Sequence, residues 1–149
     1  MFGPKRRAFG ASEPLLTTGR PGAGDFYYIT YLDGRHVSIG HDKWGYGGAQ
    51  SRPITVDYDG IQHVEVGFDP DALAGPPKEH RDAAKGPRLF VKWNGVTVLS
   101  EDASAYPSRD GDATFGENTI GGSTVRGHFS GEILKVVRVR PGQAPLGGD

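Results

Sequence analysis

The stretch His41–Arg52 gathers aromatic, glycine and hydrogen-bonding residues more densely than its surroundings. Such a mixture suits sugar recognition, which needs an aromatic ring to stack on the apolar face of a sugar and polar groups to hold its hydroxyls. Trp44 or Tyr46 could supply the ring, and the glycines that follow each of them would let the backbone approach a ligand closely. The predicted ligand-binding residues are Asp42, Trp44, Tyr46, Gln50 and Arg52.

A purely structural role explains the same residues. Trp44 could fold back to cap one end of the domain, while the glycines simply form a tight turn. A capping Trp44 would contribute to stability, whereas a ligand-stacking Trp44 would contribute to binding. Both interpretations of the stretch stay open.

Composition indicates one β-rich domain. The 149 residues suit a single domain with its own core, and 24 glycines and 11 prolines favour turns over long helices. Lysine and arginine number 17 against 18 acidic residues, so the formal net charge of −1 offers no basic surface for nucleic acid. The absence of cysteine excludes a disulfide framework and thiolate chemistry. No run approaches the roughly 18 apolar residues of a membrane span, so no membrane insertion of this segment is expected.

Short runs of β-branched and aromatic residues between turn residues predict the strands. Asp33-Gly34 predicts a hairpin between strands at 26–32 and 36–40, and Asn94-Gly95 predicts a type I′ hairpin between 88–93 and 96–99. Further strands are expected at 14–18 (an edge strand), 53–58 and 61–68. The stretch Asp69–Pro87 is expected to be an excursion between strands with a short helical turn near 78–84.

The last long apolar run, Thr119–Arg140, predicts the central strand of the domain. Its apolar residues alternate between two faces of a pleat, with Ile133, Val137 and Val139 on one face and Leu134 and Val136 on the other. Because both faces are apolar, the strand is expected to be covered on both sides. Phe129 and Ile133 are expected to lie in the core.

Three segments in order resemble laminin-G-like and concanavalin-A-like domains. Asp59–Val66 is similar to the strand DG-x-W-H-x-V-x-V of these domains, and Leu89–Val98 resembles their hairpin L-Y-V-D-G-x-x-V. Ile120–Ser123 followed by Phe129–Ile133 resembles their closing strand, I-G-G followed by F-x-G-x-I. The resemblance implies an all-β fold, a two-sheet antiparallel jelly-roll β-sandwich of the concanavalin-A type.

The resemblance covers roughly Leu15–Arg140 and has departures. Gln62 stands where these domains usually have tryptophan, and the usual acid of the hairpin is replaced. The histidine of the matching strand packs inside such sandwiches, so His63 is predicted to be buried; Trp93 is predicted to be a core residue as well. The expected organisation is a lead-in at 1–13, one sandwich domain at 14–141 and a tail at 142–149.

Calcium is the cofactor that the resemblance suggests, because laminin-G-like domains often hold this ion at a loop edge with carboxylate and carbonyl oxygens. The candidate ligands are Asp42, Asp57 and Asp59, with Asp110-Gly111-Asp112 as a further candidate. Acids at turns also have local hydrogen-bonding roles, which is the alternative explanation.

Catalysis is not expected. A laminarinase-type hydrolase of this fold would carry E-x-D-x-x-E on one strand, so that two carboxylates flank the glycosidic bond about 5 Å apart. The sequence has no such series, and it has no G-x-S-x-G elbow, H-E-x-x-H helix or phosphate-cradling loop. No catalytic residue is therefore predicted.

The expected function is that of a non-catalytic module that binds a glycan or a protein partner. It would belong to a larger bacterial extracytoplasmic protein and lie outside the cell or in the periplasm. The alternative is a structural spacer or assembly domain without a ligand. A divergent glycan hydrolase is the third possibility.

Overall fold

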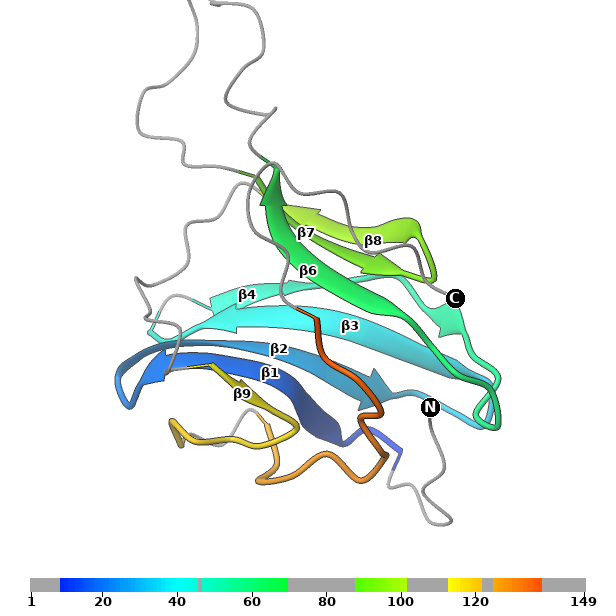
Figure 1. Ribbon diagram of the computed structural model, residues 1–149, viewed down its shortest axis with the longest axis horizontal. Helices are drawn as coiled ribbons and strands as arrows, with labels where there is room; N and C mark the ends of the chain where they lie inside the picture. Colours follow the sequence, from blue (N-terminus) through cyan, green and yellow to red (C-terminus); the bar gives the residue numbers. More distant parts are fainter. Residues whose placement is uncertain (1–8, 46, 70–87, 102–112, 122–124, 138–149) are drawn as a thin grey trace, which may run out of the picture.

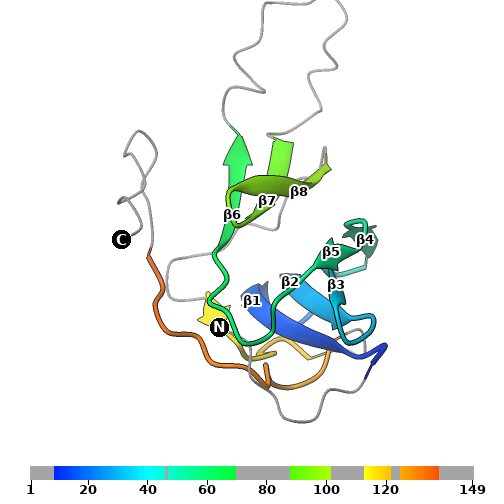
Figure 2. The ribbon, with the colours of Figure 1, turned by 90° about the vertical axis from the view of Figure 1, so that its right-hand side faces the viewer.

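The computed structural model describes residues 9–45, 47–69, 88–101, 113–121 and 125–137. These residues form no helix; their strands make two antiparallel sheets that pack face to face (Figures 1 and 2). The all-β prediction and the two-sheet sandwich are confirmed. The described part of the chain therefore contains no helix that could cross a membrane.

The larger sheet has six strands in the order β4-β3-β2-β1-β9, with β5 also paired to β3. Its strands are β1 (Ser12–Arg20), β2 (Ala23–Tyr31), β3 (His36–Lys43), β4 (Gly47–Gln50), β5 (Ile54–Thr55) and β9 (Thr114–Phe115). The smaller sheet has the order β6-β7-β8 and consists of β6 (Val64–Asp69), β7 (Arg88–Trp93) and β8 (Val96–Glu101).

Both predicted hairpins are confirmed. In the β2–β3 turn, Asp33 Oδ1 accepts hydrogen bonds from the backbone N–H groups of Arg35 at 2.7 Å and His36 at 2.8 Å. In the β7–β8 turn, Asn94 and Gly95 have φ values of 49° and 83°, and a type I′ turn requires a positive φ at both central residues. The local turn chemistry therefore fixes both hairpins.

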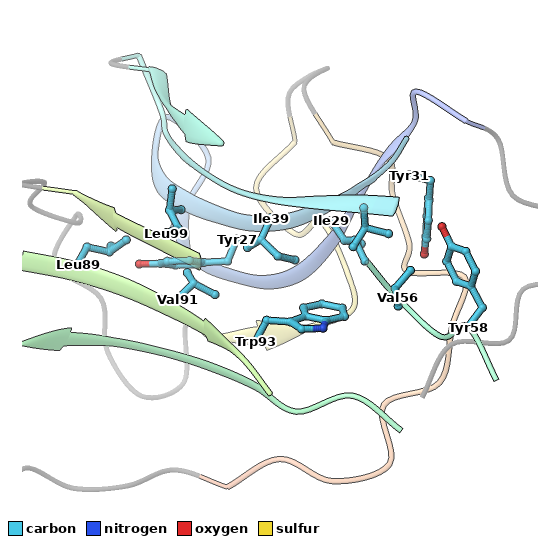
Figure 3. Packing of buried hydrophobic residues seen from close by; sticks show 11 residues of the cluster. Tyr27, Ile29, Tyr31, Ile39, Val56, Tyr58, Leu89, Val91, Trp93 and Leu99 are labelled. Atoms are coloured by element: carbon cyan, nitrogen blue, oxygen red, sulfur yellow. The ribbon is translucent and has the colours of Figure 1, made fainter. Parts of the chain in front are cut away.

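The main core lies between the two sheets (Figure 3). It is built by alternate inward side chains of facing strands, as a period of two requires. Its buried members are Tyr27, Ile29, Tyr31, Val37, Ile39, Val56, Tyr58, Leu89, Val91, Trp93 and Leu99. The prediction that Trp93 is a core residue is confirmed.

A second apolar cluster covers the opposite face of the six-stranded sheet. Phe26 and Tyr28 point outward from β2 and pack against Ile120 and Val125 of the segment that follows β9. As a result β2 is buried on both faces along almost its whole length. The central, doubly covered strand of the domain is β2.

The prediction of a central C-terminal strand is wrong for the described residues 132–137. They belong to no strand, and Ile133, Leu134, Val136 and Val137 are 39%, 55%, 47% and 45% exposed. Phe129 does pack against the core. The alternating pattern records which side chains could share a face, but a strand also needs a neighbour to pair with, and this pattern carries no information about the neighbour.

Two smaller predictions also need correction. His63 is exposed rather than buried. The strand expected at 14–18 belongs to β1, which lies between β2 and β9 and so is not an edge strand. The excursion at 70–87, with its predicted helical turn, lies outside the described residues.

Candidate functional site

The stretch His41–Arg52, which is predicted to bind a ligand, is mostly a β-hairpin. His41 and Asp42 belong to β3, which pairs with β4 so that Asp42 lies opposite Gly48. A Cβ atom at position 48 would collide with the backbone carbonyl of His41, and Gly47 has a φ of 75°. Backbone packing therefore explains both of these glycines without a ligand.

Three neighbouring strands bring three polar side chains to the outer face of the six-stranded sheet, and we call Tyr28, Asp42 and Gln50 the outer-face site. His41 points inward, so its neighbour Asp42 points outward, and the pairing of Gln50 with Gly40 places Gln50 on the same side. Tyr28 pairs with Gly40 across β2 and β3, and Gln50 Nε2 donates to Tyr28 Oη at 3.2 Å.

The phenol of Tyr28 forms the floor of this site. A Cβ at Gly40 would overlap the Tyr28 ring, with Oη only 2.6 Å away, so the ring lies across the glycine of the neighbouring strand. Burial raises the pKa of Tyr28; the hydrogen bond from Gln50 opposes this shift, and the negative charge of Asp42 adds to it. The phenol is therefore neutral at pH 7. Its own hydrogen can be donated, because Gln50 uses the oxygen as an acceptor.

Trp44 lies at the turn of the hairpin and is partly buried. It packs against the outer cluster of Phe26, Tyr28, Ile120 and Val125, and its backbone N–H donates to Gly24 O at 2.9 Å. This position lies next to the outer-face site and outside the main core. Trp44 is thus neither a cap of the inter-sheet core nor a fully exposed stacking ring.

Arg52, another predicted ligand-binding residue, does not join this group. Arg52 is exposed and follows Ser51, whose backbone N–H donates to Ile39 O at 2.7 Å, so the chain has already moved along β3 away from Asp42. Tyr46 lies outside the described residues. Asp42 and Gln50 are the predicted residues that the hairpin brings together beside Trp44.

The three predicted calcium ligands do not converge. Asp57 and Asp59 lie at the turn after β5, where Asp57 Oδ1 accepts from the backbone N–H of Asp59 at 3.1 Å. β5 pairs with the beginning of β3, whereas Asp42 lies near its end. The described residues include no group of three His, Cys, Asp or Glu side chains that could hold a metal ion. Asp110 and Asp112 fall outside the described part of the chain.

A buried charged cluster that the sequence prediction missed joins the two sheets. His41 of β3 lies between two carboxylates: its Nε2 is 2.7 Å from Asp25 Oδ1 on β2, and its Nδ1 is 2.6 Å from Glu101 Oε1 on β8. The side chains of His41, Asp25 and Glu101 are 1%, 0% and 20% exposed. We call these three residues the inter-sheet cluster.

The geometry of the inter-sheet cluster fits a doubly protonated histidine held between two carboxylates. A carboxylate only accepts hydrogen bonds, so both ring nitrogens of His41 must carry hydrogen. Burial alone would lower the pKa of His41, but the hydrogen bonds and charges of Asp25 and Glu101 outweigh burial and raise it above the ordinary value. The Tyr27 ring packs on the imidazolium with centroids 4.9 Å apart. Burial, with the charges of Asp25 and Glu101, raises the pKa of Tyr27 as well.

The inter-sheet cluster has no nitrogen to offer a substrate, because both His41 nitrogens are occupied and the ring is buried. Its role is to fix β8 of the smaller sheet against β2 and β3 of the larger one. The sequence does contain a signal for it: Asp25, His41 and Glu101 each stand two residues from a core apolar residue on the same strand. A charged residue at an inward position is the pattern to search for.

Comparison with known proteins assigns no family to the chain. No protein-family model, curated protein or solved structure was found to match it.

Proposed function

We propose that this chain is a non-catalytic binding module with a concanavalin-A-like jelly-roll sandwich, and that it binds a glycan at the outer-face site. The observation that carries the proposal is the convergence of Tyr28, Asp42 and Gln50 from three adjacent strands. Rigid strands hold such groups more firmly than a loop does, which lowers the entropic cost of binding.

The chemistry of the site favours a ligand rich in hydroxyl groups. A hydroxyl both donates and accepts; the Asp42 carboxylate accepts, the Gln50 amide does both, and the Tyr28 phenol can donate. The partly buried indole of Trp44 borders the site and can pack against the apolar face of a sugar ring. A protein partner that presents hydroxyl and amide groups is the second candidate for the same surface.

The three predicted calcium ligands do not form one site in this proposal. Asp42 lies apart from Asp57 and Asp59, so any calcium at the outer-face site would need further oxygen ligands from the bound sugar. Binding assays with and without calcium address this directly.

A spacer or assembly domain without a ligand is the alternative function. It is favoured by the packing role of the hairpin glycines and by the low exposure of Tyr28, at 6%. The position of the domain outside the cell or in the periplasm, within a larger bacterial protein, stays a prediction of the sequence.

The test is a glycan array with the wild-type protein and with Tyr28→Phe, run with and without calcium. Phenylalanine keeps the ring across Gly40 but removes the hydroxyl. The affinity for glycan should therefore fall by about tenfold, which corresponds to the loss of one hydrogen bond of roughly 1.4 kcal/mol. Tyr58→Phe is the matched control, because its hydroxyl donates to Asp33 O at the opposite end of β3. An array without hits, or equal loss in both variants, would favour the spacer.

A further inference from the structure

β6 is an edge strand whose inner face is incompletely covered. The smaller sheet ends at β6, and no described strand pairs with its free edge. Val64 pairs with Trp93 and so faces the core, yet it is 38% exposed. β6 contains neither proline nor lysine, the residues that commonly protect an edge from pairing; its acidic residues are Glu65, which is exposed, and Asp69.

The segment Glu132–Val137 is the counterpart of this edge. Its residues make no backbone hydrogen bond to another described residue, although its β-branched composition suits a strand. Just before it the chain is fixed: the backbone N–H and the Oγ of Ser130 donate to the buried carboxylate of Glu13 at 3.0 and 2.8 Å. The segment thus leaves a firm anchor with its four large apolar side chains 39–55% exposed.

The direction of the segment argues against pairing within one chain. It rises along the side of the molecule where β6 is the edge strand, and in Figures 1 and 2 both run in the same direction. Closure on its own β6 would therefore give a parallel pair, whereas the strand pairs of both sheets are antiparallel. A second copy related by a twofold axis can present the segment in the antiparallel direction.

We propose that Glu132–Val137 of one copy pairs with β6 of a second copy as an antiparallel fourth strand, and that the exchange is reciprocal. One register pairs opposite charges and covers the exposed inner edge, with Glu132 at the far end opposite Phe68. With Lys135 opposite Glu65, Val136 lies opposite Val64 and Leu134 opposite Val66, so the apolar pair covers the exposed inner edge. A slip of one residue would turn Lys135 toward the core.

The same register also matches the outer side of β6. Ile133 lies opposite Gly67, where the Phe90 ring rests across the glycine: a Cβ at position 67 would be 2.8 Å from Phe90 Cζ. Ile133 thereby gains an apolar neighbour in place of solvent. The outer-face site belongs to the other sheet; resting on the proposed function, the two sites of a dimer would act together on a repetitive ligand.

The chain has no cysteine, so single-cysteine variants give a clean test. Glu65→Cys and Lys135→Cys are made as separate proteins, mixed and mildly oxidised. Opposed residues in an antiparallel pair are 4.5–5.5 Å apart at Cα, within disulfide range. The expected product is a heterodimer joined between positions 65 and 135. Glu65→Cys mixed with Glu132→Cys is the matched control and should give at least tenfold less product, because position 132 lies several residues out of register.

Light scattering across a concentration series should show that the wild-type protein forms a dimer. Lys135→Glu should raise the dissociation constant of the dimer by about threefold to fivefold, because it places two acids opposite one another. Adding Glu65→Lys to Lys135→Glu should restore the wild-type dissociation constant. A monomer throughout the series, or no heterodimer above the control, would overturn the proposal. So would a disulfide that forms only within one chain of the Glu65→Cys/Lys135→Cys double variant, since that result would assign the segment to its own β6.

Discussion

Replacing His41 by glutamine tests the inter-sheet cluster most directly. Glutamine is similar in size but carries no charge, so the Asp25 and Glu101 carboxylates would face one another without an intervening cation. Removing one partner of a buried charged group costs about 3–5 kcal/mol. Glu101 is 20% exposed and partly screened by solvent, so we expect a loss near the lower end, about 3 kcal/mol.

The assay is urea unfolding of wild type, His41→Gln and the control His63→Gln. His63 is exposed, so the control should unfold like wild type. A domain of this size has only about 5–15 kcal/mol of stability, which makes the expected loss easy to detect. A loss below about 1 kcal/mol would mean that the ion pairs contribute nothing beyond the cost of burying them.

The pH dependence of the same measurement has a defined sign. The pKa of His41 is raised in the folded state, so folding favours the protonated ring. The contribution of His41 to stability is fully present below the unfolded pKa of about 6.5 and is lost as the pH rises through the folded pKa. Wild type should therefore lose stability above about pH 6.5, and His41→Gln should show a flatter profile. A wild-type stability that increases over this range would refute the charged histidine.

Two further pairs of substitutions test the packing of the structure by urea or thermal unfolding. Ile133→Ala should lower the free energy of unfolding by less than about 1 kcal/mol, because the side chain is 39% exposed. Leu89→Ala in the core should lower it by about 2–5 kcal/mol. Equal losses would contradict the exposed position of residue 133. Gly48→Ala should lower the melting temperature by several degrees, because its Cβ would collide with the His41 carbonyl. Gly34→Ala is the control: a Cβ there meets open space, so the melting temperature should not change. An unchanged melting temperature for Gly48→Ala would mean that the hairpin backbone shifts to accommodate the methyl group.

Local chemistry was predictable from the sequence. Asp33-Gly34 and Asn94-Gly95 specify their hairpins through side-chain hydrogen bonding and positive φ, properties that do not depend on the rest of the domain. Strand pairing was less predictable. The glycines of the hairpin at His41 hide its alternation, so the sequence does not predict its pairing. The segment at Ile133 alternates strongly and yet forms no strand.

The residues of the candidate site were likewise only partly predictable from the sequence. Asp42 and Gln50 were found from their residue types, and the structure adds the strand register that makes them neighbours. Tyr28 was missed because β2 is apolar on both faces, so its sequence does not distinguish the inward Tyr27 from the outward Tyr28. The inter-sheet contact of His41 with Glu101 joins residues far apart in the chain, and no local pattern predicts which residues meet across a sandwich.

Two aromatic rings lie across glycines of neighbouring strands: Tyr28 over Gly40, and Phe90 over Gly67. In each pair the ring occupies the volume that a side chain at the glycine would need, so a larger residue at position 40 or 67 requires a smaller one at 28 or 90. Among relatives of this chain a side chain at position 40 or 67 should accompany a smaller residue at 28 or 90, and the large aromatic should accompany glycine. Each pair would then vary as a unit during evolution, and a graft of β2 or β7 onto another sandwich would have to carry the matching glycine of the adjacent strand.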